Sequence, residues 1–253
     1  MRSPTSSYPE PIVPRVFSGV ACVKAGFSRR YGGVSEGPYR SLNLSLSTGD
    51  EESRVEENRR RFFEAQGIGP HRLAIAGQVH GSSIEVVTEP GLYPDRDALV
   101  ATVSHVALCI VAADCAVVLL VDARSPVVAA CHSGWRGTVD NIAGKTVRKM
   151  VEYGADASAI RAWVSPCISI EHFEVGPEVA ARFAKKYVVR RDRWPRPHVD
   201  LKAAIADQLG RAGIPQTQIE VSDRCTAAET DTFFSHRAEQ GTTGRMMGYI
   251  MLT

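Results

Sequence analysis

Two β-rich runs separated by a turn constrain this chain most strongly. Residues 117–121 (VVLLV) and 127–131 (VVAAC) are dominated by β-branched and apolar side chains, and the DARSP segment between them carries an aspartate and a proline, as turns commonly do. If the runs pair as a hairpin centred near Arg124, the numbers of facing residues sum to about 248. Cys115 then lies opposite or diagonal to His132, so that a thiol and an imidazole share one end of a sheet.

The surroundings of Cys115 and His132 indicate a functional site. Cys115 stands in ADC at a strand end, and His132 opens the polar, glycine-rich HSGWRG. Such exits from strands are where functional residues gather. His80, in QVHG after a short apolar run, is a third candidate ligand. One cysteine with two histidines can hold catalytic zinc with a fourth position open, and no fourth ligand stands at zinc-finger spacing. Inert packing of a small buried thiol is the alternative for Cys115.

A series of short motifs gives the chain a family resemblance from about residue 26 to the C-terminus. The motifs, in order, are FSRR with GGVS (27–35), SLNL (41–44), QVHG (78–81), DAL (97–99), ADC (113–115), HSGWRG (132–137), PCI (166–168), FEVG (173–176), CT (225–226), FFS (233–235) and GR (244–245). Each motif alone is weak, but their order along one chain is specific. The chain resembles the laccase-domain family, the YfiH-like proteins called polyphenol oxidases and also described as purine nucleoside phosphorylases.

The resemblance implies both a fold and a metal site. The implied fold is α+β, a layered sandwich of mixed sheets flanked by helices, of the YfiH/CNF-like type. The family metal ligands fall on His80, Cys115 and His132, the same three residues that strand exits indicate. These three are also the expected catalytic residues. Zinc is the implied cofactor, and copper could replace it in vitro because divalent copper outcompetes zinc at such ligands.

The resemblance also implies an activity and its substrates. Family members are described as cleaving adenosine, inosine and S-methyl-5'-thioadenosine with phosphate, which releases the free base and ribose 1-phosphate or its methylthio analogue. Adenosine deamination is the implied side activity. Purine nucleosides and phosphate are therefore the expected partners, and four family positions near the ligand pocket are expected to bind substrate: Arg30, Asn43, Gln78 and Arg245.

Arg136 is the first candidate for holding phosphate. A helix is expected to start near Thr138, directly after HSGWRG. Free amides at a helix start attract anions, and a guanidinium beside them offers a planar fork to phosphate. Pairing of Arg136 with a carboxylate that fixes the turn is the alternative. Asp97 and Asp114 are candidates for orienting a histidine or carrying a proton, and their roles as general acid or base stay open.

Three other functions stay open. A copper polyphenol oxidase is the first, although seven histidines are too few for a mononuclear site plus a trinuclear cluster. The second is a hydrolase that edits peptidoglycan precursors, either metal-dependent or with Cys115 as nucleophile and His80 or His132 as base. The third is a non-catalytic module that uses the metal site to hold a nucleoside.

The remaining pattern predicts one catalytic domain over residues 15–253, preceded by a flexible leader over residues 1–14. Helices are expected at four places, and their mixed order with strands favours an α+β fold. They are residues 50–66, an apolar stripe from Val139 to Val151 closed by Gly154, residues 177–187, and residues 201–211 with Asp200 as cap.

Composition favours a cytoplasmic enzyme. The first fourteen residues lack the apolar core of a signal peptide, so the six cysteines are expected to be reduced. The net charge of +2 and interspersed acids give no footprint for nucleic acid, and residues 190–193 are expected to form a solvated loop. No run is long enough for a membrane span. We expect a monomer or a weak homodimer.

Overall fold

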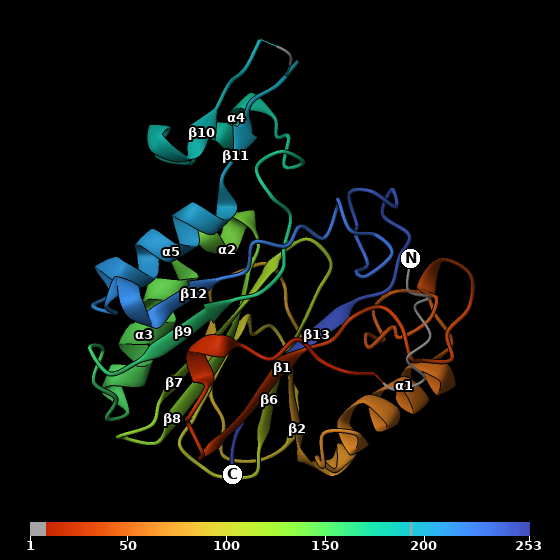
Figure 1. Ribbon diagram of the computed structural model, residues 1–253, viewed down its shortest axis with the longest axis vertical. Coiled ribbons are helices and arrows are strands. Elements are labelled where there is room, and N and C mark those ends of the chain that lie inside the picture. The colour runs from red at the N-terminus through yellow and green to blue at the C-terminus, as the bar shows by residue number, and fades with distance from the viewer. Residues whose placement is uncertain (1–8, 193) are drawn as a thin grey trace.

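Two mixed β-sheets form the centre of the computed structural model, which describes residues 9–192 and 194–253 (Figure 1). The first sheet has the order β1 (Val23–Phe27), β13 (Met246–Leu252), β6 (Ala107–Ala112), β2 (Leu73–Ala76), β4 (Gly91–Tyr93). The second sheet has the order β12 (Ile219–Val221), β9 (Arg161–Val164), β7 (Ala116–Asp122), β8 (Val127–Ser133), β5 (Ala98–Ala101), β3 (Ile84–Val86). Each sheet contains parallel and antiparallel pairs.

Helices cover the outer faces of the two sheets. Helix α1 (Glu52–Glu64) packs on the first sheet, and α3 (Ile142–Glu152) and α5 (Leu201–Arg211) pack on the second (Figure 1). The expected layered α+β sandwich of mixed sheets is confirmed. Two shorter α-helices, a two-stranded ribbon and five 3-10 helices complete the described elements. They are α2 (Trp135–Val139), α4 (Pro177–Ala180), β10 (Val188–Val189), β11 (His198–Val199), Arg15–Phe17, Gly37–Tyr39, Pro70–Arg72, Lys185–Tyr187 and Gln216–Gln218.

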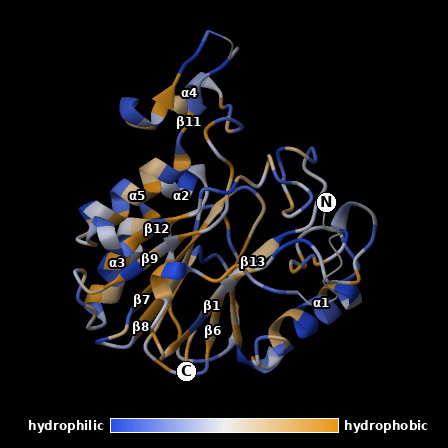
Figure 2. Ribbon diagram, in the orientation of Figure 1, coloured by the Kyte–Doolittle hydropathy of each residue, from blue (hydrophilic) through white to orange (hydrophobic). Residues whose placement is uncertain are grey.

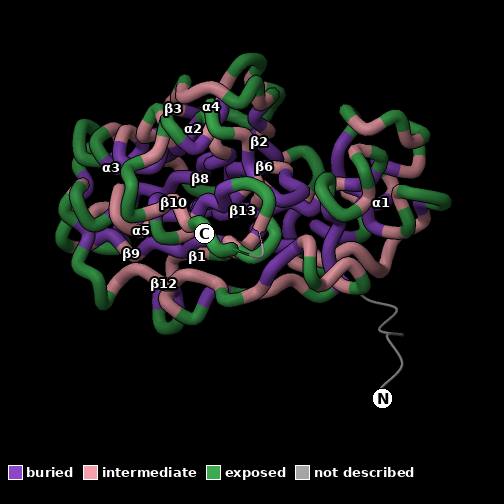
Figure 3. The backbone as a smooth tube through the Cα atoms, turned by 90° about the horizontal axis from the view of Figure 1, so that it is seen from above, coloured by how far each residue is buried: buried purple, intermediate pink, exposed green. Residues whose placement is uncertain are grey.

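Strands β7 and β8 are buried on both faces. Val118 and Leu120 pack toward α3 and α5, whereas Val117 and Leu119 pack against the first sheet. Successive side chains of a strand point to opposite faces, so a strand between two layers needs apolar residues at every position. This explains the unbroken apolar runs in the sequence. Both strands are accordingly hydrophobic in Figure 2, and β8 is buried in Figure 3.

The hairpin forms as expected, with a register one residue away. Facing residues sum to 249, because Asp122 pairs with Val127 and four residues lie between them. The carboxylate of Asp122 accepts backbone hydrogen bonds from Arg124 (2.8 Å) and Ser125 (3.4 Å), which closes this turn.

The helices agree with expectation in part. Helix α5 covers residues 201–211, and Asp200 accepts a capping hydrogen bond from the amide of Ala203 at 2.9 Å. Helix α1 is two residues shorter at each end than expected. The stripe from Val139 to Val151 does not form one helix, because Asn141 adopts a left-handed conformation (φ 60°) between α2 and α3.

The prediction of a helix over residues 177–187 is wrong for all but the first four residues. Helix α4 ends at Ala180, and the chain turns so that β10 can pair with β11 in a ribbon that projects from the body (Figure 1). The segment buries little apolar surface, so packing does not prolong the helix. In the expected loop, residues 190–192 are exposed, and residue 193 lies outside the described part.

The structure describes part of the segment expected to be a leader. Residues 1–8 lie outside the described residues. Ile12 exchanges two backbone hydrogen bonds with Phe27 of β1, and Pro14 is buried, so the described part of this segment contacts the rest of the protein. No helix in the described part of the chain combines the length and the apolar character that crossing a membrane requires.

Candidate metal centre

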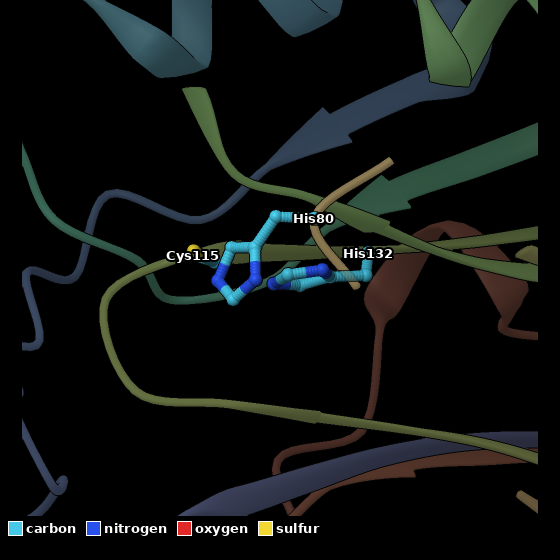
Figure 4. A group of neighbouring side chains, drawn as sticks. All are labelled: His80, Cys115 and His132. Carbon is cyan, nitrogen blue, oxygen red and sulfur yellow. The ribbon is translucent and has the colours of Figure 1, made fainter. Parts of the chain in front are cut away.

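His80, Cys115 and His132 converge from three separate segments. His80 lies in the loop after β2, Cys115 in the turn from β6 to β7, and His132 near the end of β8. One donor atom from each lies within 4.8 Å of the other two, and the sulfur and both rings face one another in Figure 4. The ring centroids of His80 and His132 are 4.9 Å apart. Among the described residues, no other set of three cysteine, histidine or acidic side chains converges in this way.

The hairpin register explains the meeting of Cys115 and His132. His132 pairs with Val117, so the side chains of His132 and Val117 lie on the same face of the sheet. Cys115 precedes Val117 by two residues and therefore lies diagonal to His132 on this face. The expected sum of 248 would have placed Cys115 and His132 on opposite faces, so the register of 249 is needed for the site.

Asp97 supports His132. The Nδ1 atom of His132 is 2.9 Å from Oδ1 of Asp97, and both side chains are buried. Because an ionised carboxylate only accepts, Nδ1 carries the proton and Nε2 is left to face Cys115. Burial raises the pKa of Asp97, but hydrogen bonds from His132 and from backbone amides outweigh burial, so this pKa is lowered. Asp97 thus remains charged beside His132.

The thiol and the imidazole are electrostatically coupled. Burial raises the pKa of Cys115, but the charge and hydrogen bond of His132, with smaller contributions from His80, lower it to about 6. For His132, burial lowers the pKa, whereas Cys115 and Asp97 raise it to about 9. Both shifts favour a thiolate beside an imidazolium in the metal-free protein. A thiolate is also the form of cysteine that binds metal.

The carboxylate of Asp114 accepts hydrogen bonds from loops around the site and not from a histidine. The backbone of Asp114 is left-handed (φ 81°), so the chain does not continue as a regular strand at this residue. This carboxylate accepts hydrogen bonds from the hydroxyls of Thr226 (2.6 Å) and Ser235 (2.8 Å) and from the amide of Arg237 (2.6 Å). Asp114 therefore joins two C-terminal segments to the turn that carries Cys115.

Two expected substrate residues are engaged within the chain. The side-chain amide of Gln78 donates to the carbonyl of Val111 and accepts from its amide, both at 2.8 Å. Asn43 is buried, donates to the carboxylate of Asp50 at 3.0 Å and accepts from the amide of Arg245 at 2.9 Å. Both side chains hold backbone segments in place, and sequence alone gave no sign of these distant partners.

Arg30, a third expected substrate residue, also has its side chain bound by other residues of the chain. Its guanidinium forms an ion pair with Glu239 at 3.0 Å, and it donates to the carbonyls of Arg40 (3.1 Å) and Thr230 (2.6 Å). The guanidinium carbon lies 4.5 Å from the centre of the Phe234 ring. Arg30 thus ties the N-terminal loop to the C-terminal loop.

Arg245 and Arg136 differ in their relation to the site. Arg245 is partly buried and donates to the carbonyls of Thr243 (2.8 Å) and Gly244 (2.9 Å). Burial lowers the pKa of Arg245, and the charge of Cys115 opposes burial more than any other group does, so Arg245 and Cys115 interact electrostatically. Arg136 is exposed on α2, which begins at residue 135 rather than near residue 138, and its guanidinium stacks over Trp135 at 4.6 Å.

The three ligand residues fit a zinc ion. Zinc binds cysteine sulfur at about 2.3 Å and histidine nitrogen at about 2.0 Å, which places its ligands roughly 4 Å or less apart. The donor atoms here are within 4.8 Å of each other, so small side-chain movements suffice. The hydrogen bond from His132 to Asp97 is the support that metal-binding imidazoles commonly have. A site with three protein ligands leaves a fourth position for water or substrate.

Comparison with known proteins finds relatives named purine nucleoside phosphorylase that align along nearly the whole chain. The chain is 39% identical over 246 residues to a protein of Deinococcus radiodurans named purine nucleoside phosphorylase, covering 96% of this chain and 94% of that protein. It is 36% identical over 235 residues to the Escherichia coli K12 protein named purine nucleoside phosphorylase YfiH, covering 91% and 94%.

Solved structures of similar proteins share the fold of this chain. The crystal structure of YlmD from Geobacillus stearothermophilus superposes with a TM-score of 0.87 at 34% identity and covers 94% of each chain. The crystal structure of a Bacillus licheniformis hypothetical protein YfiH gives the same TM-score at 32% identity, covering 91% of this chain and 93% of that one. The model of the family described as multi-copper polyphenol oxidoreductase laccase matches residues 24–253, and the chain belongs to this laccase-domain, YfiH-like family.

Proposed function

We propose that this protein is a zinc-dependent purine nucleoside phosphorylase. It cleaves adenosine, inosine and S-methyl-5'-thioadenosine with phosphate to the free base and ribose 1-phosphate or its methylthio analogue, and it deaminates adenosine as a side activity. The observation that carries the proposal is the convergence of His80, Cys115 and His132 in a chain that aligns along nearly its whole length with relatives named purine nucleoside phosphorylase.

The chain's own residues prepare the site for such chemistry. Asp97 fixes the ring of His132, and the thiolate form of Cys115 is favoured between the two imidazoles. A zinc ion held by His80, Cys115 and His132 would supply a Lewis acid that polarises a substrate atom or acidifies a bound water. The protein's contribution is a fixed ligand geometry with one open position.

Phosphorolysis also requires an anchored phosphate. In this reaction a phosphate oxygen forms a bond to the anomeric carbon, the glycosidic carbon–nitrogen bond breaks, and the base leaves with the electron pair and takes up a proton. Positioning and electrostatics dominate such a step. The sequence favoured Arg136 for binding phosphate, but we place Arg245 first because it is partly buried and interacts electrostatically with Cys115 of the metal centre. Arg136, exposed at the start of α2, is the second.

A copper polyphenol oxidase has less support. Such an enzyme needs a trinuclear copper cluster in addition to a mononuclear site. The described residues bring together one set of three ligands, and the remaining histidines of the sequence do not join it. Copper could still occupy the His80, Cys115 and His132 site in vitro, because divalent copper binds such ligands more tightly than zinc.

A thiol hydrolase is the second candidate, because Cys115, His132 and Asp97 are connected as a nucleophile, a base and an orienting acid are in cysteine hydrolases. In this second candidate function, the enzyme would hydrolyse an amide bond of a peptidoglycan precursor. Chelation separates the two candidates. A metal enzyme loses activity with its metal, whereas a thiol hydrolase keeps activity in chelator and loses it on alkylation.

The test uses protein of measured metal content, incubated with inosine in the presence and absence of phosphate. Hypoxanthine and ribose 1-phosphate are measured by mass spectrometry. Phosphate-dependent product that disappears in Cys115→Ala, but persists in Cys22→Ala, is the expected result; Cys22 is a matched control because it is also a partly exposed free thiol. Adenosine is assayed in parallel for inosine and ammonia. Nucleoside binding without turnover would contradict the proposal and favour a binding module.

A further inference from the structure

The loop of residues 78–81, which carries His80, lacks the usual sources of local order. It contains no helix or strand, and Val79 and His80 are exposed. Gln78 and His80 both have left-handed backbones (φ 52° and 60°), which side chains other than glycine rarely adopt. Neither burial nor regular hydrogen bonding explains why the loop keeps this shape. Polar groups from elsewhere in the chain must hold it.

The carboxylate of Asp97 is the principal group that holds this loop. It accepts hydrogen bonds from three successive backbone amides, those of Val79 (3.1 Å), His80 (3.1 Å) and Gly81 (2.8 Å). Successive amides that converge in this way form a concave anion-binding nest. Asp97 is fully buried, and its own backbone is bonded to Ser83. The nest is therefore occupied by a carboxylate that cannot move away into solvent.

The same carboxylate also binds a second metal-ligand residue. Oδ1 of Asp97 is 3.1 Å from the amide of His80 and 2.9 Å from Nδ1 of His132. The backbone carbonyl of Asp97 also accepts a hydrogen bond from the amide of His132 at 2.7 Å. One side chain thus fixes the backbone that carries one histidine and the ring orientation of the other.

We infer that Asp97 is the positioning residue that assembles this centre, setting His80 and His132 at the separation that a shared metal requires. The inference rests on the proposed metal centre but not on the proposed reaction. Gln78 assists, because both atoms of its amide group are bonded to the backbone of Val111 on β6. Removing a partner behind a metal ligand typically lowers metal affinity about 10–100-fold.

The test is Asp97→Asn, compared with Asp122→Asn as a matched control. Asp122 is also fully buried and also accepts three backbone amides, those of Arg124, Ser125 and Asp156, but it stands at the far end of β7. In Asp97→Asn, the zinc affinity measured by competition with a chromogenic chelator should fall about 10–100-fold. In the metal-free protein, hydrogen exchange at the amides of residues 79–81 should accelerate. Asp122→Asn should leave both quantities at the wild-type values.

A second variant covers the case in which Asp97→Asn does not fold. Gln78→Glu keeps the acceptor for the amide of Val111 but replaces the donor to its carbonyl by a carboxylate oxygen. It should also accelerate exchange at residues 79–81 and weaken zinc binding. Wild-type zinc affinity together with wild-type exchange in Asp97→Asn overturns the inference, and the same result in Gln78→Glu overturns the view that anchoring of residues 78–81 sets the position of His80. A wild-type protein that binds zinc but does not phosphorolyse inosine overturns the proposed function instead, and the zinc affinities still decide the role of Asp97.

Discussion

Cys115 and Gly134 are in such close contact that a β-carbon on residue 134 would lie 2.7 Å from the sulfur of Cys115. The same atom would lie 3.7 Å from Cδ2 of His80. The chain between His132 and α2 therefore passes directly beside the candidate metal centre. The glycine of the HSGWRG motif is required here by space rather than by its backbone angles, since its conformation is extended (φ −75°).

Gly134→Ala is expected to displace the sulfur of Cys115 and to weaken zinc binding and activity by at least tenfold, because contacts below 3.0 Å force atoms to move. Titration with a competing chelator measures the effect. Gly210→Ala is the control, since Gly210 lies within α5 with open space at its β-carbon position. This control should raise the stability by about 0.5–1 kcal/mol and leave zinc binding unchanged. Wild-type zinc affinity in Gly134→Ala would show that the sulfur is not constrained by this contact.

Asp114→Asn is expected to lower the free energy of unfolding by about 1–3 kcal/mol. The amide can still accept from Thr226 and Ser235, but its NH2 group cannot accept from the backbone amide of Arg237. Asparagine tolerates the left-handed backbone at this position, so the turn itself should persist. Urea unfolding measures the loss.

The zinc affinity of Asp114→Asn provides the contrast with Asp97. Because the carboxylate of Asp114 holds C-terminal loops rather than a histidine, zinc affinity should change less in Asp114→Asn than in Asp97→Asn. The opposite order would mean that Cys115 depends on its preceding residue more than His132 depends on Asp97.

The candidate site could be predicted from the sequence because each of its ligands lies near the end of a strand or in the loop after one. A short turn brings Cys115 and His132 to the same end of the sheet, but their side chains share a face in the observed register of 249 and not in the expected register of 248. The register itself depends on how many residues the turn holds, and the Asp122 side chain decides this by bonding the turn amides. The hydrophobic pattern carries little information about that count, since residues 117–121 and 127–131 are apolar without alternation.

Helix ends could be predicted where a side chain marks them and not elsewhere. Asp200 marks the start of α5, and this helix was placed correctly. Residues 177–187 carry a helix-compatible pattern, but pairing of β10 with β11 depends on a tertiary contact that the local sequence does not encode. The same holds for Gln78 and Asn43. The family resemblance implied substrate contacts for both residues, and the sequence does not show that their side chains bond to Val111 and Arg245, which come from distant segments.

Alkylation of Cys115 in the metal-free protein should follow a pKa of about 6. The thiolate is the reactive form, and neighbouring His132 lowers the pKa, so the rate should be nearly constant above pH 7 and fall as the pH drops through about 6. Iodoacetamide labelling followed by peptide mass spectrometry measures this residue alone. Cys131 and Cys167 are internal controls, because burial raises the pKa of each to about 12 and neither should react.

His132→Ala tests the cause of this low pKa. Without the imidazolium, burial acts on the thiol with less compensation, so the midpoint of the alkylation profile should move to higher pH. An unchanged midpoint in His132→Ala would mean that another group stabilises the thiolate.

Arg245→Ala should raise the KM for phosphate about 10–100-fold, because a charge-assisted hydrogen bond contributes about 1.5–3 kcal/mol. Arg245→Lys keeps the charge but loses the planar fork, so its KM should lie between those of the wild type and the alanine variant. Initial rates of inosine cleavage at varied phosphate concentration measure these values. Arg136→Ala is the comparison: this side chain is exposed and its charge is screened by water, so its removal should change the KM less. A larger effect from Arg136→Ala than from Arg245→Ala would place the phosphate at the start of α2 instead, outside the partly buried region where Arg245 and Cys115 interact.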